Sequence, residues 1–187
     1  MPTIFIRTTF LICHIVIQIL WAVTSRGRNI QSFLKTWTHI QSVPIVLFEL
    51  IGFIQVLLLP YLAFPITSQR VPHIELLGLF ISIFGTILAS WAKIIMGTSW
   101  GRPAQHNRKI QSRLITTGPF VFTRNPIYVG LVLLFLGQQI AYQSYGILLV
   151  ILFAVAINQA VSIEEKLLVK HFGTKYVEYM KHVPRFL

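Results

Sequence analysis

The chain has 187 residues, of which 55% are hydrophobic and 11% are charged, and its mean hydropathy is +0.70. Soluble domains carry roughly 25% charged residues, so this composition argues against a water-soluble globule. The net charge of +11 comes from basic residues that lie between long apolar runs, which indicates membrane orientation and not a nucleic-acid partner. A single cysteine, Cys13, excludes an intrachain disulfide and a cysteine cluster for a metal.

The apolar runs predict about five transmembrane helices. A membrane-spanning helix needs about 20 mostly apolar residues, as found near 4–24, 44–64 and 74–96. The uncharged block that follows, 125–163, would extend roughly 58 Å as one helix, close to twice the hydrocarbon thickness. We therefore expect a helical hairpin at 126–142 and 145–163. The first run has no convincing cleavage site and is followed at once by arginines, so we expect a retained span.

The basic residues predict the orientation of these spans. Fourteen of them fall in the segments after the first, third and fifth spans, and only Arg7 and Arg70 fall on the other side. Cytoplasmic segments are enriched in lysine and arginine, so we expect the N-terminus outside and the C-terminus in the cytoplasm.

Polar and small residues inside the spans predict how the helices pack. Gly78, Ser82, Gly85 and Ala89 share one face of the third span, which favours close helix packing. Glu49 is either a functional intramembrane group or a side chain that reaches the interface. The histidines show no ligand spacing, so no metal site is predicted. Interhelical hydrogen bonds are expected from the span amides, Gln18, Gln55, Gln138, Asn158 and Gln159.

The segment 97–125 is long for a link between helices and carries aromatic residues, so we expect it to fold against the membrane domain. Gly118-Pro119 predicts a turn. Asn125-Pro126 predicts a helix start with Asn125 as N-cap, and the next amides would form a positive dipole end suited to a carboxylate. Arg124 and Tyr128 are either interfacial residues or part of a site.

The end of the fifth span carries Glu164 and Glu165, two of only five acidic residues. They would pair with Lys166, Lys170 or an arginine of the long loop, or they belong to a site. The segment after them predicts an amphipathic helix on the membrane interface, with an apolar face made of Leu168, Phe172, Tyr176 and Tyr179.

Two blocks, SRLITTGPFVFTRNPIYVG at 112–130 and EEKLLVKHFGTKYVEYMKHVP at 164–184, resemble the integral-membrane methyltransferases typified by isoprenylcysteine carboxyl methyltransferase and related to the phospholipid methyltransferases. WAKIIMGTSW at 91–100 is also similar to that family. The resemblance covers roughly 80–187 and implies an all-α integral membrane fold. In that fold a cytoplasmic loop and a C-terminal amphipathic helix close a cofactor pocket. We expect one membrane domain, 1–187, with N-terminal spans in 1–73 and a methyltransferase-like core in 74–187.

The resemblance also implies that S-adenosylmethionine binds on the cytoplasmic side. Leu114 and Ile115 would bracket adenine, amides near Asn125 would hold the methionine carboxylate, and Glu164 would pair with the α-ammonium. By position in the motifs, the catalytic candidates are Arg124, Asn125, Tyr128 and Glu165. The cofactor-binding candidates are Gln105, Ser112, Leu114, Ile115, Gly118, Phe120, Asn125, Pro126, Ile127, Tyr128 and Glu164.

The chain departs from the family pattern at four positions. Ser112 and Asn125 replace histidines, Phe120 replaces a tyrosine, and Ala160 replaces an arginine that serves the substrate.

The predicted function is S-adenosylmethionine-dependent methyl transfer to a membrane-resident acceptor. The acceptor would be an isoprenylcysteine-type carboxylate or another lipid-like small molecule. The expected partners are therefore the bilayer and a lipophilic or prenylated substrate. The alternatives are an NADPH-dependent sterol-type reductase and a non-catalytic lipid-binding relative.

Overall fold

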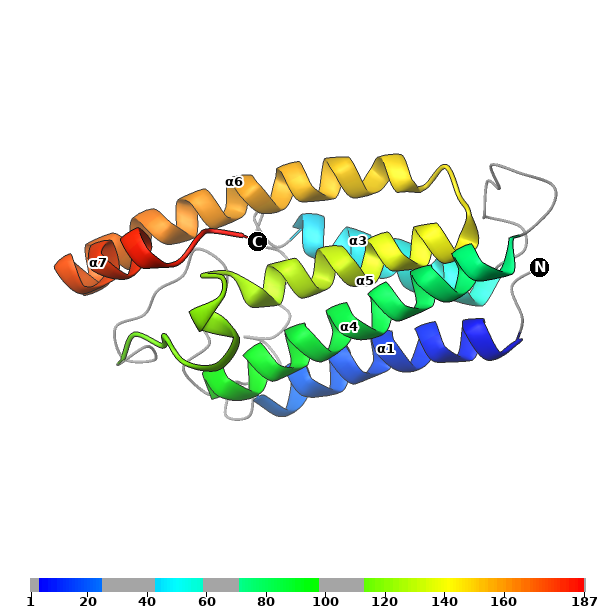
Figure 1. Ribbon diagram of the computed structural model, residues 1–187, viewed down its shortest axis with the longest axis horizontal. Coiled ribbons are helices and arrows are strands. Elements are labelled where there is room, and N and C mark those ends of the chain that lie inside the picture. The colour runs from blue at the N-terminus through cyan, green and yellow to red at the C-terminus, as the bar shows by residue number, and fades with distance from the viewer. Residues whose placement is uncertain (1–3, 25–42, 59–70, 98–112, 187) are drawn as a thin grey trace.

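The computed structural model describes residues 4–24, 43–58, 71–97 and 113–186, and every regular element in these ranges is helical. The elements are α1 (Ile4–Thr24), α3 (Val43–Leu58), α4 (Pro72–Met96), the short 3₁₀ helix η2 (Gly118–Val121), α5 (Pro126–Tyr142), α6 (Ile147–Phe172) and α7 (Thr174–His182). Figure 1 shows the long helices side by side in an elongated bundle, with η2 and α7 at one end.

Three of these helices, α1, α4 and α6, are long and apolar enough to cross a membrane, and α3 and α5 are shorter apolar helices. The predicted helix at 126–142 and the turn after it are confirmed. The expected end at 163 is wrong, because α6 continues to Phe172. Residues 164–172 contain no glycine or proline, and the helix ends only at Gly173, whose φ is +59°. Residues 59–64 of the second predicted span lie outside the described residues.

The predicted small-residue face of α4 is confirmed as a close contact with α5. A side chain on Gly78 would overlap the backbone at Gly137 and Ala141, and one on Gly85 would overlap the carbonyl of Gly130. Ser82, on the same face, donates a hydrogen bond from Oγ to the carbonyl of Leu134 at 2.8 Å. The two backbones approach this closely because the residues between them are small.

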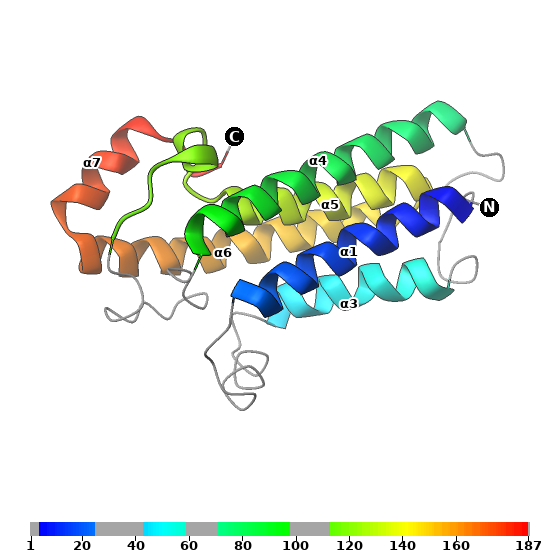
Figure 2. The same cartoon turned by 90° about the horizontal axis from the view of Figure 1, so that it is seen from below.

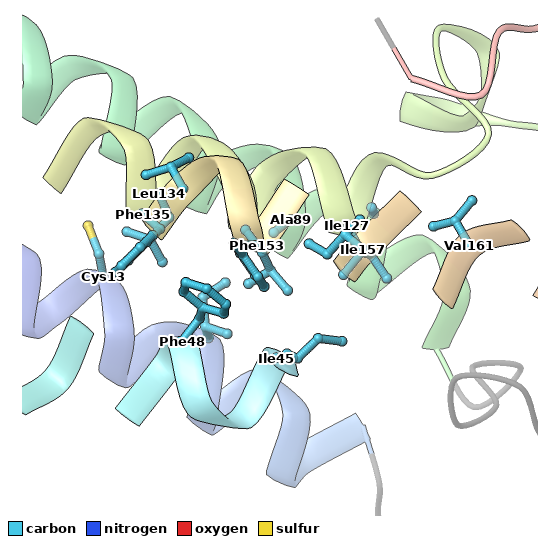
Figure 3. Packing of buried hydrophobic residues seen from close by; sticks show 14 of the residues in the cluster. Cys13, Ile45, Phe48, Ala89, Ile127, Leu134, Phe135, Phe153, Ile157 and Val161 are labelled. Carbon is cyan, nitrogen blue, oxygen red and sulfur yellow. The ribbon is translucent and has the colours of Figure 1, made fainter. Parts of the chain in front are cut away.

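The helices α1 and α3 complete the bundle by covering α4, α5 and α6 (Figure 2). Phe48 of α3 packs against Phe135 of α5 and Phe153 of α6, with ring centroids 5.2 and 4.2 Å apart (Figure 3). Because α5 and α6 form an antiparallel hairpin, the start of α5 and the end of α6 lie at the same end of the bundle, next to η2 and α7. The two sequence blocks therefore meet there.

Candidate functional site

The two adjacent glutamates near the end of α6 have different partners. Tyr128, in the first turn of α5, donates a hydrogen bond from Oη to Glu164 Oε2 at 2.8 Å. Glu165 is buried and binds two arginines: Arg124 Nε and Nη2 lie 2.9 and 2.8 Å from Oε1. On the other side, Arg185 Nε and Nη2 lie 2.9 and 2.7 Å from Oε2. Consecutive helical residues point about 100° apart, which separates the two carboxylates.

Both arginines also bind other parts of the chain. Arg124 Nη1 donates to the carbonyls of Met180 and Val183 at 3.1 and 2.6 Å. Arg185 Nη1 donates to Asn158 Oδ1 and Ser162 Oγ of α6 at 3.2 and 3.0 Å. One carboxylate thus holds the segment before α5 and the C-terminal tail together on α6. The predicted pairing with a loop arginine is confirmed for Glu165.

Further hydrogen bonds join the tail to the segment that leads into α5. Tyr179 Oη donates to the carbonyl of Phe120 at 2.6 Å. Thr123 Oγ1 and Asn125 Nδ2 both donate to the carbonyl of Arg185 at 3.0 Å. Burial raises the pKa of Tyr179 to about 12, against the opposing effect of Arg124, so the phenol keeps its proton and remains a donor at neutral pH.

The start of α5 points its first amides toward this cluster. Asn125 occupies the N-cap position and Pro126 the first helical position, as predicted, but the Asn125 side chain forms no capping hydrogen bond. That part of the expectation is wrong: a capping bond would be accepted by Oδ1, whereas the hydrogen bond that orients this side chain is donated by Nδ2 to the tail carbonyl of Arg185. The first intrahelical bond runs from Val129 N to the carbonyl of Asn125, so the amides of Ile127 and Tyr128 have no i−4 acceptor.

The structure brings most of the predicted site residues to one end of the bundle. Asn125 to Tyr128, Glu164 and Glu165 converge, and Tyr128 and Glu164 are half-buried. Ile115, Phe120 and Ile127 pack in the hydrophobic core beneath them. Half-buried Leu114 and Gly118, whose φ is +62°, lie on the approach to η2. Gln105 and Ser112 fall outside the described residues.

Sequence reasoning did not identify Arg185, Tyr179 or Thr123 as residues of this cluster. The sequence gives one indication: basic residues outnumber acidic residues by 16 to 5, so a buried carboxylate is expected to have a basic partner, although several are possible. Among the described residues, no group of three histidine, cysteine, aspartate or glutamate side chains is placed to hold a metal ion.

The sequence is similar to a family model and to several known proteins. The family model described as phospholipid methyltransferase matches residues 74–175, which is more than half of the chain. The chain is 26% identical over 120 residues to a protein-S-isoprenylcysteine O-methyltransferase of Xenopus laevis, covering 62% of this chain and 41% of that protein. It is 32% identical over 111 residues to protein-S-isoprenylcysteine O-methyltransferase B of Arabidopsis thaliana, covering 57% and 55%. The match thus spans about half, or less, of these relatives' lengths.

Proposed function

Because the chain belongs to the phospholipid methyltransferase family, we propose that it transfers a methyl group from S-adenosylmethionine to an acceptor that resides in the membrane. The observation that carries the proposal is the 2.8 Å hydrogen bond between Tyr128 and Glu164. It joins the first turn of α5 to α6 near its end, so that a helix N-terminus and a half-buried carboxylate lie close together.

These groups fit the amino-acid part of S-adenosylmethionine, which carries an α-carboxylate and an α-ammonium. The first-turn amides of α5 would bind the carboxylate, and Glu164 would bind the ammonium. Leu114 and Ile115 would lie against adenine, with Phe120 and Ile127 shaping the apolar floor. When bound, the cofactor supplies an electrophilic methyl group on a sulfonium.

In this proposal Arg124 and Glu165 position the site and do not touch the reacting atoms. Each is occupied by the other and by the tail, and both are buried, with exposed side-chain fractions of 8% and 4%. Their ion pair keeps the segment before α5 against α6, which sets the distance between the amides of α5 and Glu164. Asn125 supports the same arrangement through its hydrogen bond to the tail.

We propose a carboxylate on a lipophilic molecule, such as a prenylated cysteine, as the methyl acceptor. The relatives are named as O-methyltransferases of isoprenylcysteine. A carboxylate attacks without losing a proton, whereas an amine must first transfer its proton to a base. Glu165 is neutralised by two arginines, which leaves Glu164 as the one carboxylate beside Tyr128 among the described residues. The excess of basic residues at this end would place the site at the cytoplasmic face.

Calorimetry on the purified protein in lipid nanodiscs tests the cofactor assignment. The parent protein should bind S-adenosylmethionine. Glu164→Ala should weaken binding roughly 10- to 100-fold through loss of a charge-assisted hydrogen bond. Tyr128→Phe should have a smaller effect. Glu178→Ala, which removes an exposed carboxylate of α7, should leave binding unchanged. A folded parent protein that binds no S-adenosylmethionine would refute the proposal.

A second assay tests the acceptor. Transfer of isotopic methyl is measured to an S-farnesyl cysteine with a free carboxylate, to its carboxamide, and to phosphatidylethanolamine. Label should appear in the free carboxylate alone. Label in the phospholipid amine would overturn the carboxylate assignment, and binding of cofactor without any transfer would favour a non-catalytic relative. NADPH is the negative control for cofactor binding, because a sterol-type reductase would bind it.

A further inference from the structure

A second polar cluster lies between α1, α3 and α5, far along the bundle from the glutamates of α6. His14 lies in the middle of α1 and is 2% exposed, and Gln138 and Gln139 of α5 are fully buried. Gln18 of α1 and Glu49 and Gln55 of α3 complete the cluster. Its α1 and α3 members lie outside the segment matched by the family model, and the proposed methyl transfer does not use them.

The backbone fixes how the Gln138 amide is oriented. Its Nε2 donates to the carbonyl of Gly52 at 2.9 Å and to Gln55 Oε1 at 3.2 Å. Rotating the amide by 180° would place its oxygen against the Gly52 carbonyl, which is itself only an acceptor. Gln138 Oε1 therefore faces His14, at 2.8 Å from Nε2. It follows that Nε2 of His14 carries a proton and donates it.

The other ring nitrogen then requires a proton of its own or a protonated partner. His14 Nδ1 lies 3.0 Å from Glu49 Oε2, to which Gln18 Nε2 also donates at 3.4 Å. A bare imidazole nitrogen and a bare carboxylate oxygen would repel each other at this distance. One proton therefore lies between them, either as imidazolium with carboxylate or as neutral imidazole with carboxylic acid. Both forms contain the same number of protons and have no net charge.

We propose that His14 and Glu49 form an intramembrane proton-binding site that fastens α1 and α3 to α5. Loss of the shared proton would leave a net negative charge among apolar helices, and a second proton would leave a positive one; both are costly in hydrocarbon surroundings. The remaining hydrogen-bond partners of the pair, Gln18 and Gln138, are uncharged. The proton thus completes a chain of hydrogen bonds across three helices that is satisfied only when all three are docked.

Ring-nitrogen spectra of ¹⁵N-histidine-labelled protein in phosphatidylcholine nanodiscs test the proton's presence. The His14 signals are the ones that move in Glu49→Gln. We expect Nε2 protonated, together with either a protonated Nδ1 and an ionised Glu49, or a neutral ring and a protonated Glu49. The infrared difference between parent and Glu49→Gln distinguishes the two forms of the carboxyl group. A bare Nε2, or a neutral ring beside an ionised carboxylate, would overturn the proposal.

Unfolding of matched variants tests the fastening role. His14→Leu leaves Glu49 without its partner, so its thermal midpoint should fall below that of His14→Leu/Glu49→Leu, which removes both polar groups. Gln18→Leu, which loses only the 3.4 Å contact, is the control and should stay near the parent. If His14→Leu does not fold, Glu49→Gln is compared with the double variant, and it should unfold at the higher temperature because its amide still donates to Nδ1. A thermal midpoint of His14→Leu at or above that of the double variant, or Glu49→Gln no better than the double variant, would refute the role.

Discussion

The two polar clusters of this molecule each join separate segments of the chain through buried polar groups, but they do so with different chemistry. At the α7 end, Glu165 is held by two guanidinium groups, whose remaining donors reach backbone carbonyls and polar side chains. Between α1, α3 and α5, one histidine and one glutamate are surrounded by glutamine amides. The first cluster joins segments of irregular backbone, which offer carbonyl acceptors. The second joins continuous helices, whose backbone groups are mostly paired within each helix, so side-chain amides supply most of the partners and the Gly52 carbonyl adds one more.

The largest effect is expected at the ionic cluster, which consists of Glu165, Arg124 and Arg185. Glu165→Leu would leave Arg124 and Arg185 without their shared carboxylate. Removing one partner of a buried ion pair costs about 3–5 kcal/mol, so this variant should unfold at a much lower temperature, or fail to fold. Thermal unfolding in nanodiscs measures the change. Glu178→Ala, which breaks an exposed pair with Lys181, is the control, with an expected cost of about 0–1 kcal/mol. Equal effects at the two glutamates would show that the cluster does not hold the tail.

An intermediate effect is expected at the amide cluster between α1, α3 and α5, which contains His14, Glu49 and the buried glutamines. Substituting a glutamine there does not leave a charged side chain without its ionic partner. Gln138→Leu removes the hydrogen bonds to Gly52, Gln55 and His14 and leaves their polar groups buried. The expected cost is about 1–3 kcal/mol, the range for buried polar groups that lose a partner. Gln159→Leu, on an exposed face of α6, is the matched control and should change stability by less than about 0.5 kcal/mol. A Gln138 effect as large as that of Glu165 would mean that the two clusters do not differ in kind.

The comparison also marks what sequence alone can predict. The hairpin of α5 and α6 follows from the length of an uncharged block, and the α4–α5 contact follows from small residues at helical spacing. The convergence of Tyr128 with Glu164 follows from the hairpin once both motifs are recognised. These three features can be predicted because each depends on a local sequence pattern or on the single turn between α5 and α6.

The rest depends on contacts between distant segments. Arg185 reaches Glu165 and so fixes the tail, but 16 basic residues offer no pattern that selects it. His14 and Glu49 belong to different helices and lie 35 positions apart, so neither apolar run shows the pair. The end of α6 was misplaced because hydropathy reports where a span leaves the hydrocarbon, whereas the helix itself ends at Gly173.

The smallest expected effect is at Tyr179, which joins α7 to η2 through a single neutral hydrogen bond. Tyr179→Phe should cost about 1 kcal/mol and lower the unfolding temperature by roughly 2–4 °C. Since the folded-state pKa is raised from 10.0 to about 12, the contribution is fully present below pH 10 and disappears as the pH rises through 12. The difference between parent and variant should therefore be the same at neutral pH and just below pH 10. Tyr145→Phe, at an exposed tyrosine, is the control. If both substitutions had the same effect, the phenol would not hold α7 in place, and the tail would depend on its contacts with Arg124, Glu165, Thr123 and Asn125.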